Sequence, residues 1–139
     1  MAVLTIIGII IGLMALYMFI EYLNNFSLRN YRYEFFSVAH FTQIIIGYWM
    51  IYFGNSLYTK ALKAGGDLLN GELLMAIGAV AVLIILYKNF MATPFGVALA
   101  LSAIQLALSL PLAVGAFFVL LIAIAVLAET KPVYVLNND

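Results

Sequence analysis

Apolar and charged residues occupy separate blocks along this chain. The charge-free stretches are Met1 to Ile20, Phe35 to Thr59, Leu73 to Tyr87 and Asn89 to Ala128. Each of the first three suits one membrane-crossing helix, which needs about 17–25 residues. The last holds roughly 40 residues, too many for one crossing of a ~30 Å hydrocarbon core at about 1.5 Å per residue. It therefore predicts two helices, separated by a break at Ser109-Leu110-Pro111.

The pattern predicts an all-α, polytopic integral membrane bundle of five helices in a single domain, residues 1–139. The expected helices span residues 2–22, 35–64, 71–89, 94–109 and 112–128. Pro111 supports the last break, because a proline disfavours helical geometry at the residue before it. The alternative is four helices, with one long helix kinked at Pro111, whose apolar projection would need a protein partner to cover it.

Composition supports a membrane location. Hydrophobic residues make up 67% of the chain and charged residues 9%, against about 45–50% and about 25% in globular domains. We expect a multi-pass protein, with the cell membrane as the first expectation. The first apolar segment lacks the basic residues that open a signal peptide, so we expect a retained helix.

Several chemistries are disfavoured by what the chain lacks. The net charge is zero, which gives no electrostatic case for nucleic acid. The chain has no cysteine and one histidine, which disfavours zinc, iron–sulfur and bis-histidine haem sites. Phosphate-binding loops, dinucleotide fingerprints and nucleophile elbows are also missing. We therefore expect no catalytic residues, no metal, no cofactor and no enzymatic activity.

Small residues at helical spacing predict packing seams, since they let membrane helices approach closely. The seams are expected at Gly8, Gly12, Gly47, Gly96, Ala100 and Ala103. Rings and cations beside apolar runs are typical of the headgroup level. The expected interfacial anchors are Arg29, Arg32, Tyr31, Tyr33, Trp49 and Lys88.

One polar constellation could carry chemistry. Ser37, His40 and Gln43 fall near one helical face, together with Gly47. Polar groups at membrane depth normally face protein or water. His40 is either the titrating group of a proton- or solute-handling site or a partner in an interhelical hydrogen bond, and the second interpretation is favoured. Gln105 in the last apolar stretch is expected to join helices rather than line a pore.

These observations favour a non-catalytic structural or accessory subunit of a larger membrane assembly. The expected partners are membrane lipids and either other membrane subunits or copies of the same chain. A small homo-oligomeric channel or transporter for ions or small solutes is the first alternative. A self-assembling envelope or virion membrane protein is the second.

Overall fold

The computed structural model describes residues 1–129, and this part of the chain is all-helical. Its four helices are α1 (Ala2–Tyr31), α2 (Val38–Ala64), α3 (Leu69–Ala92) and α4 (Phe95–Glu129). Three of them, α1, α3 and α4, are long and apolar enough to cross a membrane. The prediction of an all-helical chain with helices able to span a membrane is confirmed at this level.

The prediction of five helices is wrong, because α4 continues through Pro111 as one helix of 35 residues. A proline removes one backbone donor from a helix, which leaves the carbonyl four residues earlier, here that of Ala107, without its usual helical partner. Contacts with a neighbouring helix can offset that cost. Here α2 is hydrogen-bonded to α4 on both sides of the proline. The Tyr48 hydroxyl donates to the Leu106 carbonyl at 3.0 Å, and Trp49 Nε1 donates to the Ala113 carbonyl at 3.0 Å.

The first helix is longer than predicted. The polar residues expected to form a connection after residue 22 are helical as far as Tyr31. Two of them hold the short linker to α2: the Asn24 Oδ1 atom accepts from the Phe36 N–H at 3.2 Å, and the Ser27 hydroxyl donates to the Tyr33 carbonyl at 2.7 Å. A run that looks like a loop is therefore a helix end whose side chains fasten the linker.

The ends of α2 follow from local capping. The Ser37 hydroxyl accepts from the His40 N–H, an N-cap that starts α2 at Val38 rather than at residue 35. Gly65 takes φ 65° at the C-cap, and the Gly66 N–H donates to the Ala61 carbonyl at 2.8 Å. The helix end predicted at residue 64 is confirmed, and its cause is Gly65, because glycine adopts the left-handed conformation without a steric penalty.

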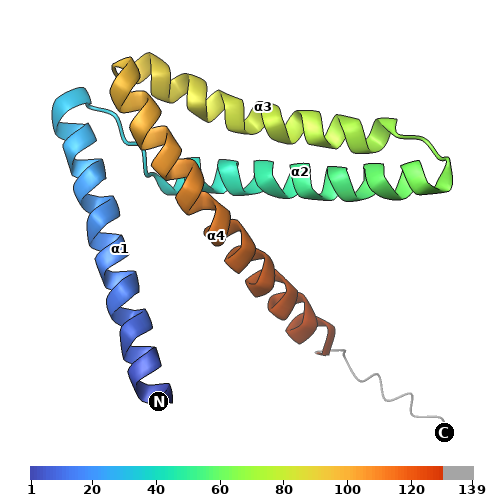
Figure 1. The fold of residues 1–139 in the computed structure, drawn as a ribbon, viewed down its shortest axis with the longest axis horizontal. Helices are drawn as coiled ribbons and strands as arrows, with labels where there is room; N and C mark the ends of the chain where they lie inside the picture. Colours follow the sequence, from blue (N-terminus) through green and yellow to red (C-terminus); the bar gives the residue numbers. More distant parts are fainter. Residues whose placement is uncertain (130–139) are drawn as a thin grey trace, which may run out of the picture.

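Helices α2 and α3 form a tight antiparallel hairpin (Figure 1). Four glycines, seven residues apart on each helix, allow this approach; we name them the glycine seam, and they are Gly47, Gly54, Gly71 and Gly78. A methyl group on Gly71 would lie 2.6 Å from the Tyr58 nitrogen, and one on Gly78 would lie 2.6 Å from the Gly47 carbonyl oxygen. The two backbones are thus in direct contact.

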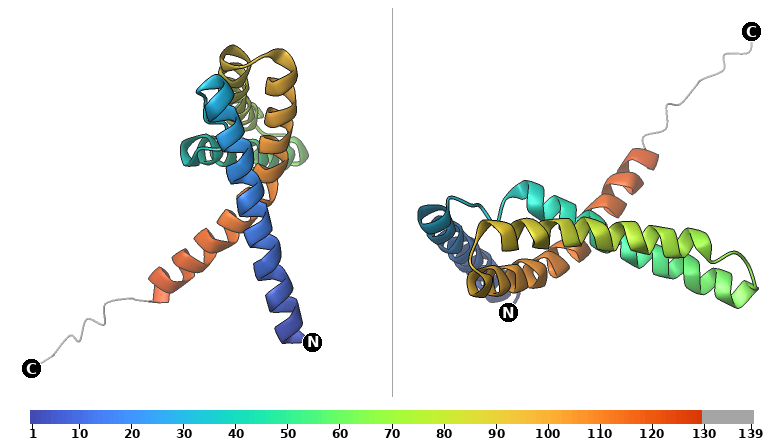
Figure 2. Two further views of the ribbon diagram at one scale, coloured as in Figure 1. Left: turned by 90° about the vertical axis from the view of Figure 1, so that its left-hand side faces the viewer. Right: turned by 90° about the horizontal axis from the view of Figure 1, so that it is seen from above.

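The other two helices leave the hairpin at one of its ends. Helix α1 joins there through its C-terminal part, and α4 starts there and crosses α2 (Figure 1). The far ends of α1 and α4 then diverge (Figure 2, left). A small core secures the junction: Phe35, Phe36 and Leu101 are buried, and Ile20 and Leu23 of α1 pack against them. The polar network described below lies at the same junction.

Candidate functional site

A buried amide, Asn89, is the centre of the polar network at the junction. Its Nδ2 atom donates to the Ser102 hydroxyl and to Gln105 Oε1, both at 2.8 Å. Its Oδ1 atom accepts from the Tyr33 hydroxyl at 2.9 Å. The backbone carbonyl of Asn89 accepts from the Thr93 hydroxyl at 2.8 Å. One side chain near the end of α3 therefore joins the α1–α2 linker to α4.

The second amide, Gln105, extends this network to the start of α2. Its Nε2 atom donates to the Phe35 carbonyl, and its backbone carbonyl accepts from the Ser109 hydroxyl at 2.7 Å. The Phe35 carbonyl also lies 3.2 Å from His40 Nδ1. Gln105 is completely buried. The amide thus bridges α3, the linker and α4, which is the joining arrangement expected from the sequence.

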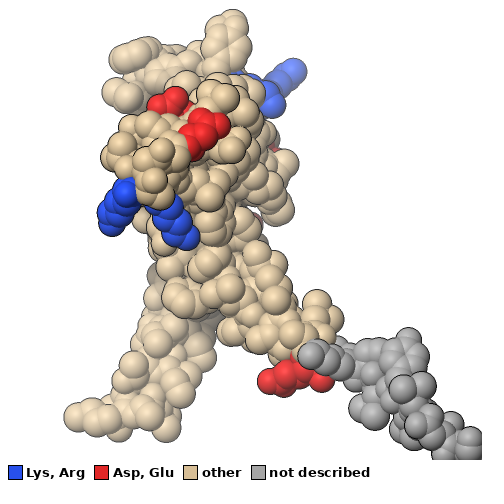
Figure 3. Space-filling model, turned by 90° about the vertical axis from the view of Figure 1, so that its right-hand side faces the viewer, with Lys and Arg blue, Asp and Glu red and all other residues tan. Residues whose placement is uncertain are grey.

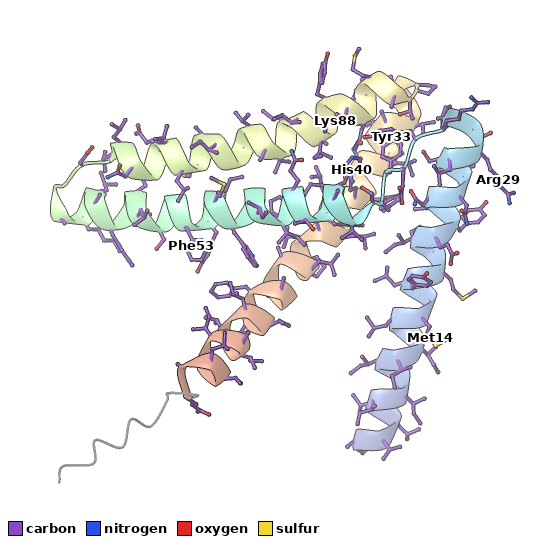
Figure 4. The ribbon with its side chains drawn as sticks, turned by 180° about the vertical axis from the view of Figure 1, so that it is seen from behind. Met14, Arg29, Tyr33, His40, Phe53 and Lys88 are labelled. Carbon is purple, nitrogen blue, oxygen red and sulfur yellow. The ribbon has the colours of Figure 1, made fainter. Side chains whose placement is uncertain are left out.

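Tyr33 is a linker residue whose side chain contacts both α3 and His40. Its ring centroid is 5.8 Å from the centroid of the His40 ring, and Figure 4 shows the two side chains close together near the end of α3. Partial burial raises the pKa of the Tyr33 hydroxyl above its ordinary value of 10.0. The hydroxyl therefore stays protonated at neutral pH and remains the donor to Asn89.

The predicted constellation on α2 is divided among separate contacts. Ser37 is the N-cap of α2. His40 lies against the Phe35 carbonyl. Gln43 donates from Nε2 to the Ala81 carbonyl of α3 at 2.9 Å and so belongs to the hairpin. Only His40 and Gln105 share an acceptor. None of the four predicted polar residues lines the hollow between α2 and α4 or the hollow on α1.

The predicted packing positions fall into two groups, one inside the α2–α3 hairpin and one on the surface. Gly47 belongs to the glycine seam, whereas a methyl group on Gly8, Gly12 or Gly96 would meet nothing within 4 Å. Of the small residues on α4, Ala100 and Ala103 are exposed. Contact of these positions with another molecule stays a prediction.

The predicted interfacial residues have different environments. Arg29 and Lys88 are exposed, and Tyr31 stacks edge-on against Phe26 at 6.3 Å. Arg32 takes φ 55° at the end of α1. Trp49 is half-buried and bonded to α4. For Trp49 the structure therefore adds a helix-joining contact to the expected anchoring role.

We expect Trp49→Phe to weaken the contact between α2 and α4. The substitution keeps an aromatic ring near Phe117 but removes the donor to the Ala113 carbonyl. The free energy of unfolding should fall by about 1 kcal/mol, measured by loss of helical circular dichroism during denaturant titration in micelles. Tyr52→Phe is the matched control, since Tyr52 is exposed and its hydroxyl has no described partner. Equal effects would contradict a role for the indole N–H.

The network is built to join helices. In the described part of the chain, no buried side-chain nitrogen or oxygen lacks a hydrogen-bond partner. In that same part, no three His, Asp or Glu side chains gather as metal ligands do. A polar network whose members are all paired makes a junction rigid and specific. Its donors and acceptors are already used by one another, so they leave little capacity to bind a solute.

The sequence pattern did not predict the hydrogen bonds made by Asn89 and Tyr33. Asn89 lies beside Lys88, which made it look like a surface residue at a helix end. The available signal was its place at the start of the longest charge-free run, where an amide needs a partner. Tyr33 was expected at the headgroup level, a position that does not predict a bond to α3.

No protein-family model, curated protein or solved structure matches this chain. The functional argument therefore depends on the geometry alone.

Proposed function

We propose that this chain is a non-catalytic structural subunit of a larger membrane assembly. One contrast carries the proposal. At the junction the buried polar side chains are hydrogen-bonded to one another, whereas the helices that extend from it expose their apolar side chains. No residue in the most apolar stretch of α1 is buried, and in α4 the corresponding share is 6%. A short junction thus holds α1 and α4, whose most apolar stretches have little contact with the rest of the chain.

The surface of these helices supports the proposal. In the view of Figure 3 the two diverging limbs carry no charged side chain until the end of α4. Membrane helices associate through close van der Waals packing, which small residues favour. Gly8 and Gly12 on α1 and Gly115 on α4 are all open to the surroundings. A methyl group at any of these positions would meet nothing within 4 Å, which leaves the helix backbone accessible to a neighbour.

The junction supports a structural role rather than transport. A transport path needs polar groups free to bind a solute, and the buried amides here are bonded to each other and to carbonyls. A surface hollow between α2 and α4 is lined by apolar and aromatic side chains, including Trp49, Phe53 and Phe117. Neither region offers a polar route along the described helices.

The test is photo-crosslinking in the native membrane followed by native mass spectrometry. A photoreactive residue at Met14, which is exposed on α1 (Figure 4), is expected to capture other polypeptides at a fixed stoichiometry. The matched control is Ile85, which is completely buried and should give no intermolecular product. A closed homo-oligomer would favour a channel instead, and a monomer without crosslinks would refute the proposal.

A further inference from the structure

A small hollow lies on the side of α1 near its C-terminal end. It is lined by Tyr22, Asn25, Phe26, Arg29 and Asn30, and its volume is about 380 Å³. Spacings of three, four and seven residues place these side chains on neighbouring positions of one helical face. Since one water occupies about 30 Å³, the hollow has room for a group the size of a phosphate.

The charge of this hollow is unbalanced. Arg29 is its cation, and no carboxylate lines it. Within residues 1–129 the Arg29 guanidinium has no ion-pair partner. The Glu34 carboxylate accepts from Asn24 Nδ2 at 3.0 Å and does not line the hollow. Figure 4 shows Arg29 pointing away from the rest of the molecule. The hollow therefore complements an anion.

The hydrogen-bond donors that line the hollow suit the oxygen atoms of a phosphate group. A guanidinium is a planar fork that can bind two phosphate oxygens at once. The Asn25 amide and the Tyr22 hydroxyl have no described partner, so both can donate. The Asn30 amide already donates to the Phe26 carbonyl at 2.9 Å, which fixes one wall of the hollow.

The position on α1 distinguishes a lipid from a soluble anion. On the N-terminal side of the hollow, α1 is charge-free from Met1 to Ile20 and its large apolar side chains are exposed. An acyl chain can lie along this surface while its headgroup sits beside the tyrosine and the arginine, as is typical of the membrane interface. We infer that this hollow binds the phosphate of a membrane phospholipid. The inference goes beyond the proposed structural role and does not depend on it.

The experiment compares lipid binding to the full chain in mild detergent by native mass spectrometry. The probes are phosphatidylglycerol and a diacylglycerol with the same acyl chains. For Arg29→Gln we expect about tenfold weaker binding of phosphatidylglycerol, because the bidentate contact is lost, with diacylglycerol unchanged. The matched control is Arg32→Gln, which removes one charge three residues later, outside the hollow, and should change binding less than twofold.

The other outcomes overturn the inference. Equal losses in the two arginine variants would show a general charge effect, and no loss in Arg29→Gln would show that the hollow does not hold the phosphate. Displacement of the lipid by millimolar inorganic phosphate would assign the hollow to a soluble anion. Arg29 is exposed and has no ion-pair partner among residues 1–129, so Arg29→Gln should unfold at the same temperature as the unmodified chain, which circular dichroism checks.

Discussion

Truncation of Asn89 to alanine is expected to lower the free energy of unfolding by about 2–4 kcal/mol. The change removes the acceptor of the Tyr33 hydroxyl and the donor to Ser102 and Gln105. Because the site is buried, water cannot replace these bonds, and the remaining groups carry the cost of being unpaired. Reversible unfolding in mixed micelles, followed by the fluorescence of the single tryptophan, measures the loss.

Two comparisons separate the network from a general effect of losing an amide. Asn55→Ala, at an exposed position of α2, should change stability by less than about 0.5 kcal/mol. A double-mutant cycle of Asn89→Ala with Gln105→Ala should show a coupling energy of about 0.5–3 kcal/mol, as expected for side chains in contact. Strictly additive losses would mean that the two amides do not act together.

The glycine seam should be intolerant of even one methyl group. Gly71→Ala is expected to destabilise the chain by about 1–3 kcal/mol, the usual cost of overpacking a filled interior. The added carbon would lie 2.6 Å from the Tyr58 nitrogen and 2.8 Å from the Gly54 carbonyl oxygen, and neither backbone atom can move independently. Denaturant titration of the purified chain measures the change.

The matched control, Gly115→Ala, is expected to change stability in the opposite direction. Gly115→Ala, at a helical position where the new methyl meets nothing within 4 Å, should stabilise the chain by up to about 1 kcal/mol through helix propensity alone. Both substitutions replace a helical glycine by alanine, so a difference in sign between them reports the contact of α2 with α3. If Gly71→Ala behaved like Gly115→Ala, the close approach of the two helices would be refuted.

Helix ends were predictable wherever a local signal determined them. Gly65 ends α2 because of its left-handed backbone, and this needs no other part of the chain. The end of α1 was missed because Asn24 and Ser27 look like loop residues until their tertiary partners, the Phe36 N–H and the Tyr33 carbonyl, are known. Local rules cannot reveal a partner that the helix reaches across a linker.

The candidate site shows the same division. Gln105 was recognisable because an amide in a charge-free run needs a partner. Its partners were not recognisable, because Asn89 and Phe35 come from other parts of the chain and meet it only after α3 and α4 pack. The glycine seam was equally hidden: a spacing of seven shows a common face, but not which helix lies opposite.

The sequence by itself determined that this is a helical protein with segments apolar enough for a membrane, because burial of apolar residues in lipid depends on composition and run length. Only the tertiary structure decided that Pro111 lies inside one helix. The reason is physical: a proline costs a helix one backbone hydrogen bond, a cost that tertiary contacts can offset, and here Tyr48 and Trp49 of α2 are hydrogen-bonded to α4 on either side of Pro111.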